Sequence, residues 1–130
     1  MILIGTDICI ELLRGNNIVI ENRLSSDEQV SISFMTVGEL YYGAERSSNK
    51  IKNKNVVDEF LLSIDIIDTD LEILKKFGEL KSNLYRNSAL LPDADILIAA
   101  TVLTKCTKLI TGNSKHFNRI ENLSLENWLV

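Results

Sequence analysis

The run DADILIAATVLT, residues 93–104, limits the possible folds of this chain more than any other segment. It follows Pro92, opens with two carboxylates and is then apolar on nearly every side of a helix, which is typical of a central helix buried against a sheet. Short apolar segments that suit strands occur at residues 2–4, 30–34, 64–67, 109–110 and 123–125. Helical periodicity separates them. This alternation predicts an α/β fold in which helices flank a mostly parallel central sheet.

The remaining elements are read from the same periodicity. Helices are expected at residues 7–14, 18–24, 36–46, 55–62, 71–88 and 93–104. The polar and basic stretch SSNKIKNKN, residues 47–55, predicts a loop, and GNSKHF, residues 112–117, predicts a turn. We find no internal repeat and no linker, so one domain should span residues 1–130.

Composition narrows the class of protein. At 130 residues and 45% hydrophobic content, the chain can bury a core without disulfides, and its two cysteines lack the spacing of a zinc site. A formal net charge of -4 argues against indiscriminate coating of nucleic acid. No apolar run reaches the roughly 20 residues of a membrane span, and the N-terminus lacks the pattern of a signal peptide. We therefore expect a cytoplasmic protein that does not enter a membrane.

Acidic and amide side chains follow the predicted strands. Asp7 comes just after the first strand, Glu39 lies in the first turn of the helix after the second, and Asn113 follows the strand at 109–110. Asp93 and Asp95 open the central helix. In a parallel sheet these positions converge beyond the carboxyl ends of the strands. Oxygen ligands gathered there suit Mg²⁺ or Mn²⁺ better than zinc and indicate phosphoryl chemistry.

Four fragments in this order resemble the PIN-domain family, and most closely the VapC toxins of bacterial VapBC toxin–antitoxin pairs. They are LIGTDICIELLRG, SFMTVGELYYGAERS, LPDADILIAA and LITGNSKHFNRI. The resemblance covers nearly the whole chain. It implies a magnesium- or manganese-dependent endoribonuclease acting on structured RNA, commonly transfer RNA. It also implies a homodimer, neutralised by a VapB-type antitoxin whose C-terminal segment enters the acidic cleft.

The resemblance also assigns residues to the site. Glu39 and Asp95 match the acids that would ligate the ion directly, and Asp93 matches an accessory acid. Asn113 stands where many relatives have a further Asp, and its amide oxygen could still bind the ion or its water. Gly5 departs from the pattern, because the family's D-T-[ND] motif reads G-T-D here. The position of the first metal-binding Asp therefore has no ligand.

Glycine supplies neither an oxygen nor a charge to a divalent ion, so we expect the activity of this chain to be impaired or absent. Asp7 could replace the missing carboxylate if the first strand continues past Gly5, but a role in capping the following helix is the stronger expectation. Gly5 itself could instead serve a positive φ angle or a close backbone approach. The sequence leaves open whether an ancestral Asp was lost by engineering, during cloning or naturally.

Glu39, Thr6 and His116 each have a structural explanation as well. Thr36 and Glu39 have the spacing of a capping box, in which Glu39 would bind the backbone of Thr36 instead of a metal. The hydroxyl of Thr6 could serve a carboxylate or a bound water, or could equally serve the helix entry. His116 has no partner at ligand spacing, so we expect it to pack beside Phe117 and assign it no role.

Basic residues could line an RNA-facing rim, although ordinary solvated surface also explains them. These candidates are Arg14, Arg46, Lys50, Lys52, Lys54, Arg86 and Lys115. Two other functions remain open. One is an interaction module that keeps the fold but has lost catalysis. The other is a Toprim-like phosphotransferase, which also uses a Glu and a DxD pair; its DxD should follow a strand, whereas DAD here follows Pro92 and opens a helix.

Overall fold

Five short strands form the centre of the molecule in a computed structural model that describes all 130 residues. The strands are β1 (Ile2–Ile4), β2 (Val30–Ser33), β3 (Asp65–Ile67), β4 (Leu109–Ile110) and β5 (Leu125–Glu126). The helices are α1 (Thr6–Leu13), α2 (Asn17–Ser25), α3 (Phe34–Arg46), α4 (Lys50–Leu61), α5 (Leu71–Arg86), α6 (Asp93–Lys105) and α7 (Ser114–Phe117). Strand and helix alternate along most of the chain, as the apolar pattern predicts.

The sheet has the order β3-β2-β1-β4-β5, and all four pairings are parallel. This confirms the predicted α/β class, and the sheet is parallel throughout. The chain first builds outward from β1 through β2 and β3, and then returns to place β4 on the other side of β1. Neighbouring strands whose connections run in opposite directions leave a crevice beyond their carboxyl ends. The pair β1 and β4 therefore marks the expected position of a ligand site.

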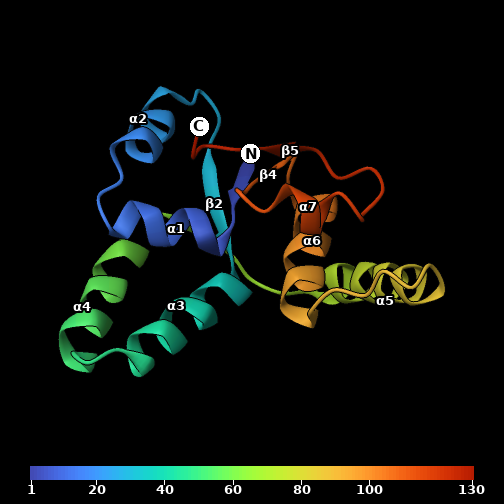
Figure 1. Cartoon of the computed structure of the whole chain (residues 1–130), viewed down its shortest axis with the longest axis horizontal. Helices are drawn as coiled ribbons and strands as arrows, with labels where there is room; N and C mark the ends of the chain where they lie inside the picture. Colours follow the sequence, from blue (N-terminus) through green and yellow to red (C-terminus); the bar gives the residue numbers. More distant parts are fainter.

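Alternate residues of the strands enter two separate cores. Ile2, Ile4 and Ile110 pack with α1 to α4 on one face of the sheet. Leu3 and Leu109 pack on the other face with α5, α6 and α7. Figure 1 shows the two groups of helices on opposite sides of the strands. Because both faces are covered, the central strands β1 and β4 can be apolar throughout, which explains their short unbroken runs of Ile and Leu.

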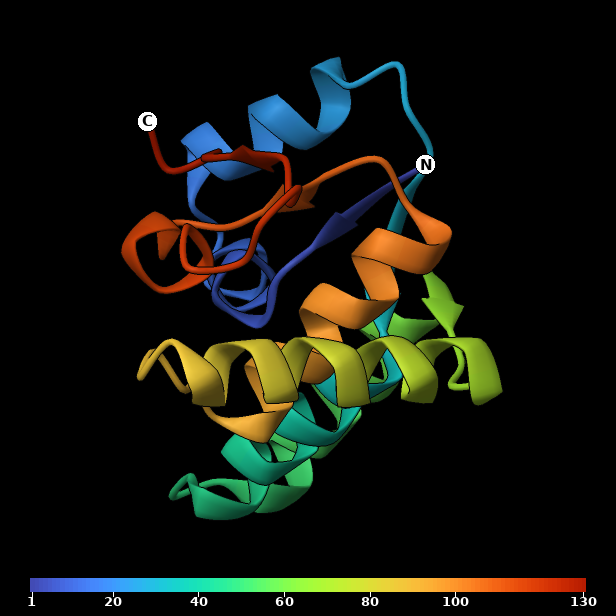
Figure 2. The ribbon, with the colours of Figure 1, turned by 90° about the vertical axis from the view of Figure 1, so that its right-hand side faces the viewer.

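Helix α6 is the buried central helix that its sequence predicts. Six of its residues are buried: Ile96, Ile98, Ala99, Ala100, Thr101 and Val102. Pro92 is its N-cap residue, and α5 lies across it on the outside of the molecule (Figure 2). None of the seven helices combines the length and the apolar character needed to cross a membrane. The first turn of α6, which carries Asp93 and Asp95, is thereby fixed at the edge of the sheet.

Two predicted irregular segments are helical. The expected loop at 47–55 is wrong beyond Asn49, because the Asn49 side chain accepts a hydrogen bond from the Lys52 backbone and caps α4. Lys50, Lys52 and Lys54 thus lie in the first turns of that helix. The expected turn at 112–117 contains the one-turn helix α7.

The start of α3 also differs from the prediction. Phe34 was expected to end the second strand, but Ser33 already caps the helix by accepting a hydrogen bond from the Met35 backbone. Glu39 therefore lies in the second turn of α3, and the first-turn position is wrong. The capping-box explanation of Thr36 and Glu39 is wrong as well, since both residues lie inside the helix. The Glu39 side chain is consequently available for another partner.

Candidate active site

A small cavity of about 110 Å³ lies where β1 and β4 end, at the crevice that the topology predicts. It draws residues from four distant parts of the sequence. The lining residues are Gly5, Thr6, Asp7, Glu39, Asp95, Ile98, Thr111, Asn113 and Phe117. Glu39 and Asp95, the two carboxylates assigned to the ion, thus share one cavity. A wide separation of these two acids would have excluded a common ion, and the fold brings them together.

Glu39 is held by a chain of two hydroxyl groups. Thr6 Oγ1 donates to Glu39 Oε1 at 2.7 Å, and Thr36 Oγ1 lies 2.9 Å from Thr6 Oγ1. A hydroxyl has one hydrogen to give, so Thr36 must donate to Thr6 when Thr6 donates to Glu39. Thr36 is fully buried, which fixes this chain from the core outward. Of its two predicted roles, Thr6 therefore has the contact with a carboxylate.

Gly5 stands at the junction of β1 and α1, where it is the N-cap residue of the helix. Its backbone is extended, with φ -73° and ψ 168°, so the positive-φ explanation of this glycine is wrong. The second explanation of this glycine, a close approach of neighbouring atoms, agrees with the structure. A Cβ atom at this position would lie 3.0 Å from Asp7 Oδ1 and 3.3 Å from the carbonyl oxygen of Ile110. A side chain would thus fit only if the Asp7 carboxylate moved slightly.

Asp7 joins the start of α1 to the end of β4. Its Oδ2 accepts from the Gly112 backbone at 2.8 Å and from Thr111 Oγ1 at 3.1 Å. Its Oδ1 accepts from the Ile8 backbone at 3.0 Å. Gly5 is the N-cap residue of α1, so the expected cap position of Asp7 is wrong, although Asp7 Oδ1 does accept from a free N–H of the first turn. These hydrogen bonds occupy the carboxylate, so Asp7 is poorly placed to supply an oxygen in place of a side chain at Gly5.

Asp95 lies in the first turn of α6 with little of its side chain exposed. Burial raises the pKa of this carboxyl above its usual range, and the negative charge of Asp7 raises it further. His116 acts in the opposite direction, because its Nδ1 lies 3.0 Å from Asp95 Oδ2. The cavity therefore places carboxylates close enough to disfavour each other's charge, which is the environment in which a cation is stabilised.

Asn113 and Asp93 have different positions. Asn113 lines the cavity as the N-cap residue of α7, and its side chain makes no capping hydrogen bond. The Asp93 side chain is largely exposed and pairs with Lys81 on α5, with 3.0 Å between Oδ1 and Nζ. Asp93 is not among the cavity residues. The structure thus brings Asn113 to the two central acids and leaves Asp93 outside.

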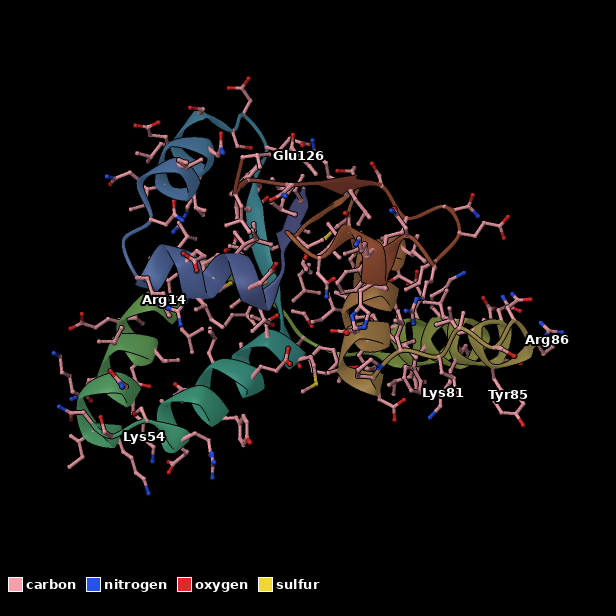
Figure 3. All side chains as sticks on the ribbon, viewed as in Figure 1. Arg14, Lys54, Lys81, Tyr85, Arg86 and Glu126 are labelled. Carbon is pink, nitrogen blue, oxygen red and sulfur yellow. The ribbon has the colours of Figure 1, made fainter.

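The predicted basic residues do not form one patch. Figure 3 shows Arg14 and Lys54 at one end of the molecule and Arg86 at the other. Several are paired with neighbours: Arg14 with Glu11, Lys54 with Glu45, and Arg86 with Asn83. Arg14 and Lys52 line a groove that also contains Glu39, and Lys115 lies in α7 between the cavity residues Asn113 and Phe117.

The sequence and the fold match a known protein family. A PIN domain family model matches residues 2–123. The chain belongs to the PIN-domain family. It is 32% identical over 129 residues to Ribonuclease VapC2 of Rickettsia felis, covering 97% of this chain and 96% of that protein. It is 28% identical over 127 residues to the tRNA(fMet)-specific endonuclease VapC of Shigella flexneri, with 97% and 96% covered.

A solved structure supports the same assignment. The crystal structure of VapBC2 from Rickettsia felis, bound to a DNA fragment from its promoter, contains a chain that matches with a TM-score of 0.89 and 33% identity. The match covers 98% of this chain and 99% of that chain. The protein is therefore a VapC-type member of the PIN family, similar to proteins named as VapC ribonucleases.

The donors in this PIN-domain cavity are of the kind that a hard divalent cation prefers. They are the carboxylates of Glu39 and Asp95, the side-chain amide of Asn113 and nearby hydroxyl groups. No group of three His, Cys, Asp or Glu side chains is arranged to hold a metal ion. The set fits Mg²⁺ or Mn²⁺ in chemical type, and Gly5, where the resemblance leads us to expect an Asp, adds no oxygen to it.

Sequence reasoning missed two residues of this VapC site. His116 contacts Asp95, and Thr111 links the Asp7 carboxylate to the backbone N–H of Asn113, which donates to Thr111 Oγ1 at 3.1 Å. Neither contact can be recognised from residue spacing in the sequence, because β4 and α7 meet β1 and α6 only in the fold. Phe117 does pack beside His116, in an edge-to-face arrangement with ring centroids 6.3 Å apart.

The raised pKa of Asp95 yields a stability prediction. The unfolded-state pKa of this carboxyl is about 3.8, and its folded-state pKa is higher. The charged form therefore destabilises the fold as the pH rises from the unfolded-state pKa to the folded-state pKa and above. Asp95→Asn removes this charge, so it should raise the Tm of the metal-free protein by a few degrees at neutral pH. The gain should vanish below about pH 3.8, where both states bind the proton. Thermal unfolding in chelator across this range, with Asp93→Asn as the control, measures it. An equal effect of both variants, or no change with pH, would contradict this account.

Proposed function

We propose that this chain is a VapC-type endoribonuclease that requires Mg²⁺ or Mn²⁺, and that Gly5 leaves it weak or inactive. The observation that supports the proposal most is the shared cavity of Glu39 and Asp95 beyond the ends of β1 and β4. The chemistry would be hydrolysis of an RNA phosphodiester. When bound, the ion would supply an activated water and positive charge at the leaving oxygen.

The residues of the chain have separate tasks in this proposal. Glu39 and Asp95 would ligate the ion directly, and the Thr36–Thr6 hydroxyl chain would hold Glu39 in one orientation. Asn113 would assist through a water. Asp93 would act only from outside the cavity, also through water, because Lys81 holds its carboxylate. The phosphate backbone of the RNA would approach an acidic site only when a cation screens it.

The missing acid should lower the affinity for the ion and also misplace the attacking water. A lost carboxylate removes one ligand and one negative charge, and misplacement of a reacting group by about 1 Å can lower the rate on the order of a hundredfold. The same feature favours one alternative, a PIN module that binds partners without cutting RNA. A response of activity to restoring the acid separates the two.

Structured RNA, and transfer RNA in particular, is the proposed substrate class, since a relative from Shigella flexneri carries the name of a tRNA(fMet)-specific endonuclease. Arg14 and Lys52, in the groove that contains Glu39, and Lys115, between two cavity residues, are the basic residues proposed to meet its phosphates. We propose that the protein acts in the cytoplasm. A homodimer is also proposed, and the exposed apolar residues at one edge of the fold, Ile66, Leu71 and Leu74, are candidates for its interface.

The proposed protein partner is a VapB-type antitoxin. A groove of about 500 Å³ runs between α1, α3 and α4, and its apolar walls include Ile10, Leu40 and Val56. Glu39 lines both this groove and the cavity, so the two adjoin at this residue. A segment with apolar side chains in the groove and a basic side chain at its end would cover the groove and neutralise the acids. The related chain from Rickettsia felis was solved as a VapBC2 complex.

Restoring the first acid tests the enzymatic proposal. Gly5→Asp adds a carboxylate, but its Cβ would lie only 3.0 Å from Asp7 Oδ1 and two negative charges would face each other. Asp7→Asn keeps an oxygen acceptor for the Gly112 backbone and removes that repulsion. The double variant should therefore cleave a mixed transfer-RNA pool with Mn²⁺ about 10- to 100-fold faster than the present chain.

Matched variants show whether any gain comes from the metal site. Gly5→Ala adds the Cβ without the charge and should give no gain. Glu39→Gln in the double variant should abolish the gain, as should removal of Mn²⁺ with a chelator. A folded double variant that binds Mn²⁺ and cuts RNA no faster than the present chain would overturn the enzymatic proposal and leave the interaction module.

The groove can be tested separately from catalysis. Val56 is 38% exposed in the groove wall, whereas Leu62 is 89% exposed just after the same helix and outside the groove. Val56→Glu places a charge among apolar contacts and should weaken binding of the cognate VapB-type antitoxin at least about tenfold, while Leu62→Glu should leave it unchanged. Isothermal titration calorimetry measures both. Equal affinities for the two variants would place the antitoxin elsewhere.

A further inference from the structure

His116 is the one side chain of α7 that contacts a carboxylate of the site. Its Nδ1 lies 3.0 Å from Asp95 Oδ2, and both side chains are mostly shielded, with 31% and 22% exposed. His116 is not among the cavity residues, so it contacts Asp95 from outside the cavity lining. Any effect on the reaction would therefore pass through Asp95.

The imidazole nitrogen has no other partner. His116 Nδ1 is buried, and in this geometry its N–H is not aligned closely enough with Oδ2 for a directed hydrogen bond. Buried polar atoms without a hydrogen bond are uncommon and call for an explanation. Asp95 is the acceptor beside it, and a small rotation of either side chain would complete the bond. The packing of the ring edge-to-face with the buried Phe117 limits how far the imidazole can turn.

We propose that His116 is a positioning residue for Asp95, whose Nδ1–H holds Asp95 Oδ2 and leaves Oδ1 as the oxygen that faces the cation. This inference rests on the proposed metal site. Groups that hydrogen-bond to a metal ligand fix its orientation, and losing them commonly lowers metal affinity by about 10- to 100-fold. The orientation of Asp95 matters more than usual in this chain, because Gly5 leaves fewer ligands to hold the ion.

Helix α7 makes this arrangement possible. Asn113 precedes the helix and lines the cavity, and one turn later the chain returns with His116 behind Asp95. The Asp7–Thr111–Asn113 contacts hold the start of this turn. A single short segment thereby places one donor inside the cavity and a second behind its neighbouring carboxylate.

The first test reads the imidazole directly and needs no metal. At a pH where the imidazole is neutral, ring ¹⁵N chemical shifts should show the proton on Nδ1, and Asp95→Asn should change them while Asp93→Asn does not. A proton on Nε2, leaving a bare Nδ1 beside the carboxylate, would overturn the proposal. Its outcome does not depend on whether the chain binds Mn²⁺ or cuts RNA.

The second test separates positioning from packing. The side-chain amide nitrogen of Asn stands as many bonds from Cβ as Nδ1 does, that of Gln matches Nε2, and Phe retains only the ring. In the Gly5→Asp/Asp7→Asn background, His116→Asn should keep Mn²⁺ affinity within about threefold, whereas His116→Gln and His116→Phe should lower it about 10- to 100-fold. Titration of Mn²⁺ followed by electron paramagnetic resonance measures this, and equal affinities for the Asn and Phe variants would contradict the proposal.

The two proposals fail in distinguishable ways. Absence of Mn²⁺ binding in every variant would defeat the proposed metal site, while the tautomer of His116 would still decide whether its Nδ1 can hold Asp95. Binding that ignores position 116, together with a proton on Nε2, would instead remove His116 and leave the metal site intact.

Discussion

The hydrogen bonds between the Asp7 carboxylate and the end of β4 are the contacts on which the rest of the site depends. They join the start of α1, which carries Gly5 and Thr6, to the turn that carries Asn113 and His116. Parallel pairing of β1 and β4 brings the two segments together, and Asp7 then fixes the distance between them. Thr6, next to Asp7, contacts Glu39, and His116, in the turn after β4, contacts Asp95, so this connection joins the partners of both acids.

The sequence predicts the fold and the central acids for physical reasons that can be stated. Unbroken apolar strands and the apolar helix at 93–104 require a sheet covered on both faces, and ligands of such sheets lie beyond the strand ends. Glu39, Asp95 and Asn113 follow from that rule and from the resemblance to PIN domains. The contact of His116 with Asp95 could not be predicted, because it depends on how α7 packs against α6. Lys50 to Lys54 were misassigned because one side chain, Asn49, decides between loop and helix.

Gly5 bears both on the proposed metal site and on the packing of Asp7. It stands where the resemblance leads us to expect an Asp, and it also provides the space into which Asp7 Oδ1 approaches, 3.0 Å from where a Cβ would stand. The glycine and the aspartate at position 7 therefore suit each other in the metal-free protein. Fewer like charges and a relaxed contact favour the fold, whereas in the proposed metal site the ion would have one ligand fewer. The chain has the PIN architecture and the groove that contains Glu39 with this glycine in place.

The central claim is that Glu39 and Asp95 can share one divalent cation. The most direct measurement is anomalous diffraction from crystals of the present chain soaked in a high concentration of Mn²⁺. The account predicts one anomalous peak between the two carboxylates, on the side of the cavity that Asn113 lines. A peak held by other residues, or an empty cavity at saturating Mn²⁺ with both acids in the positions described, would contradict it.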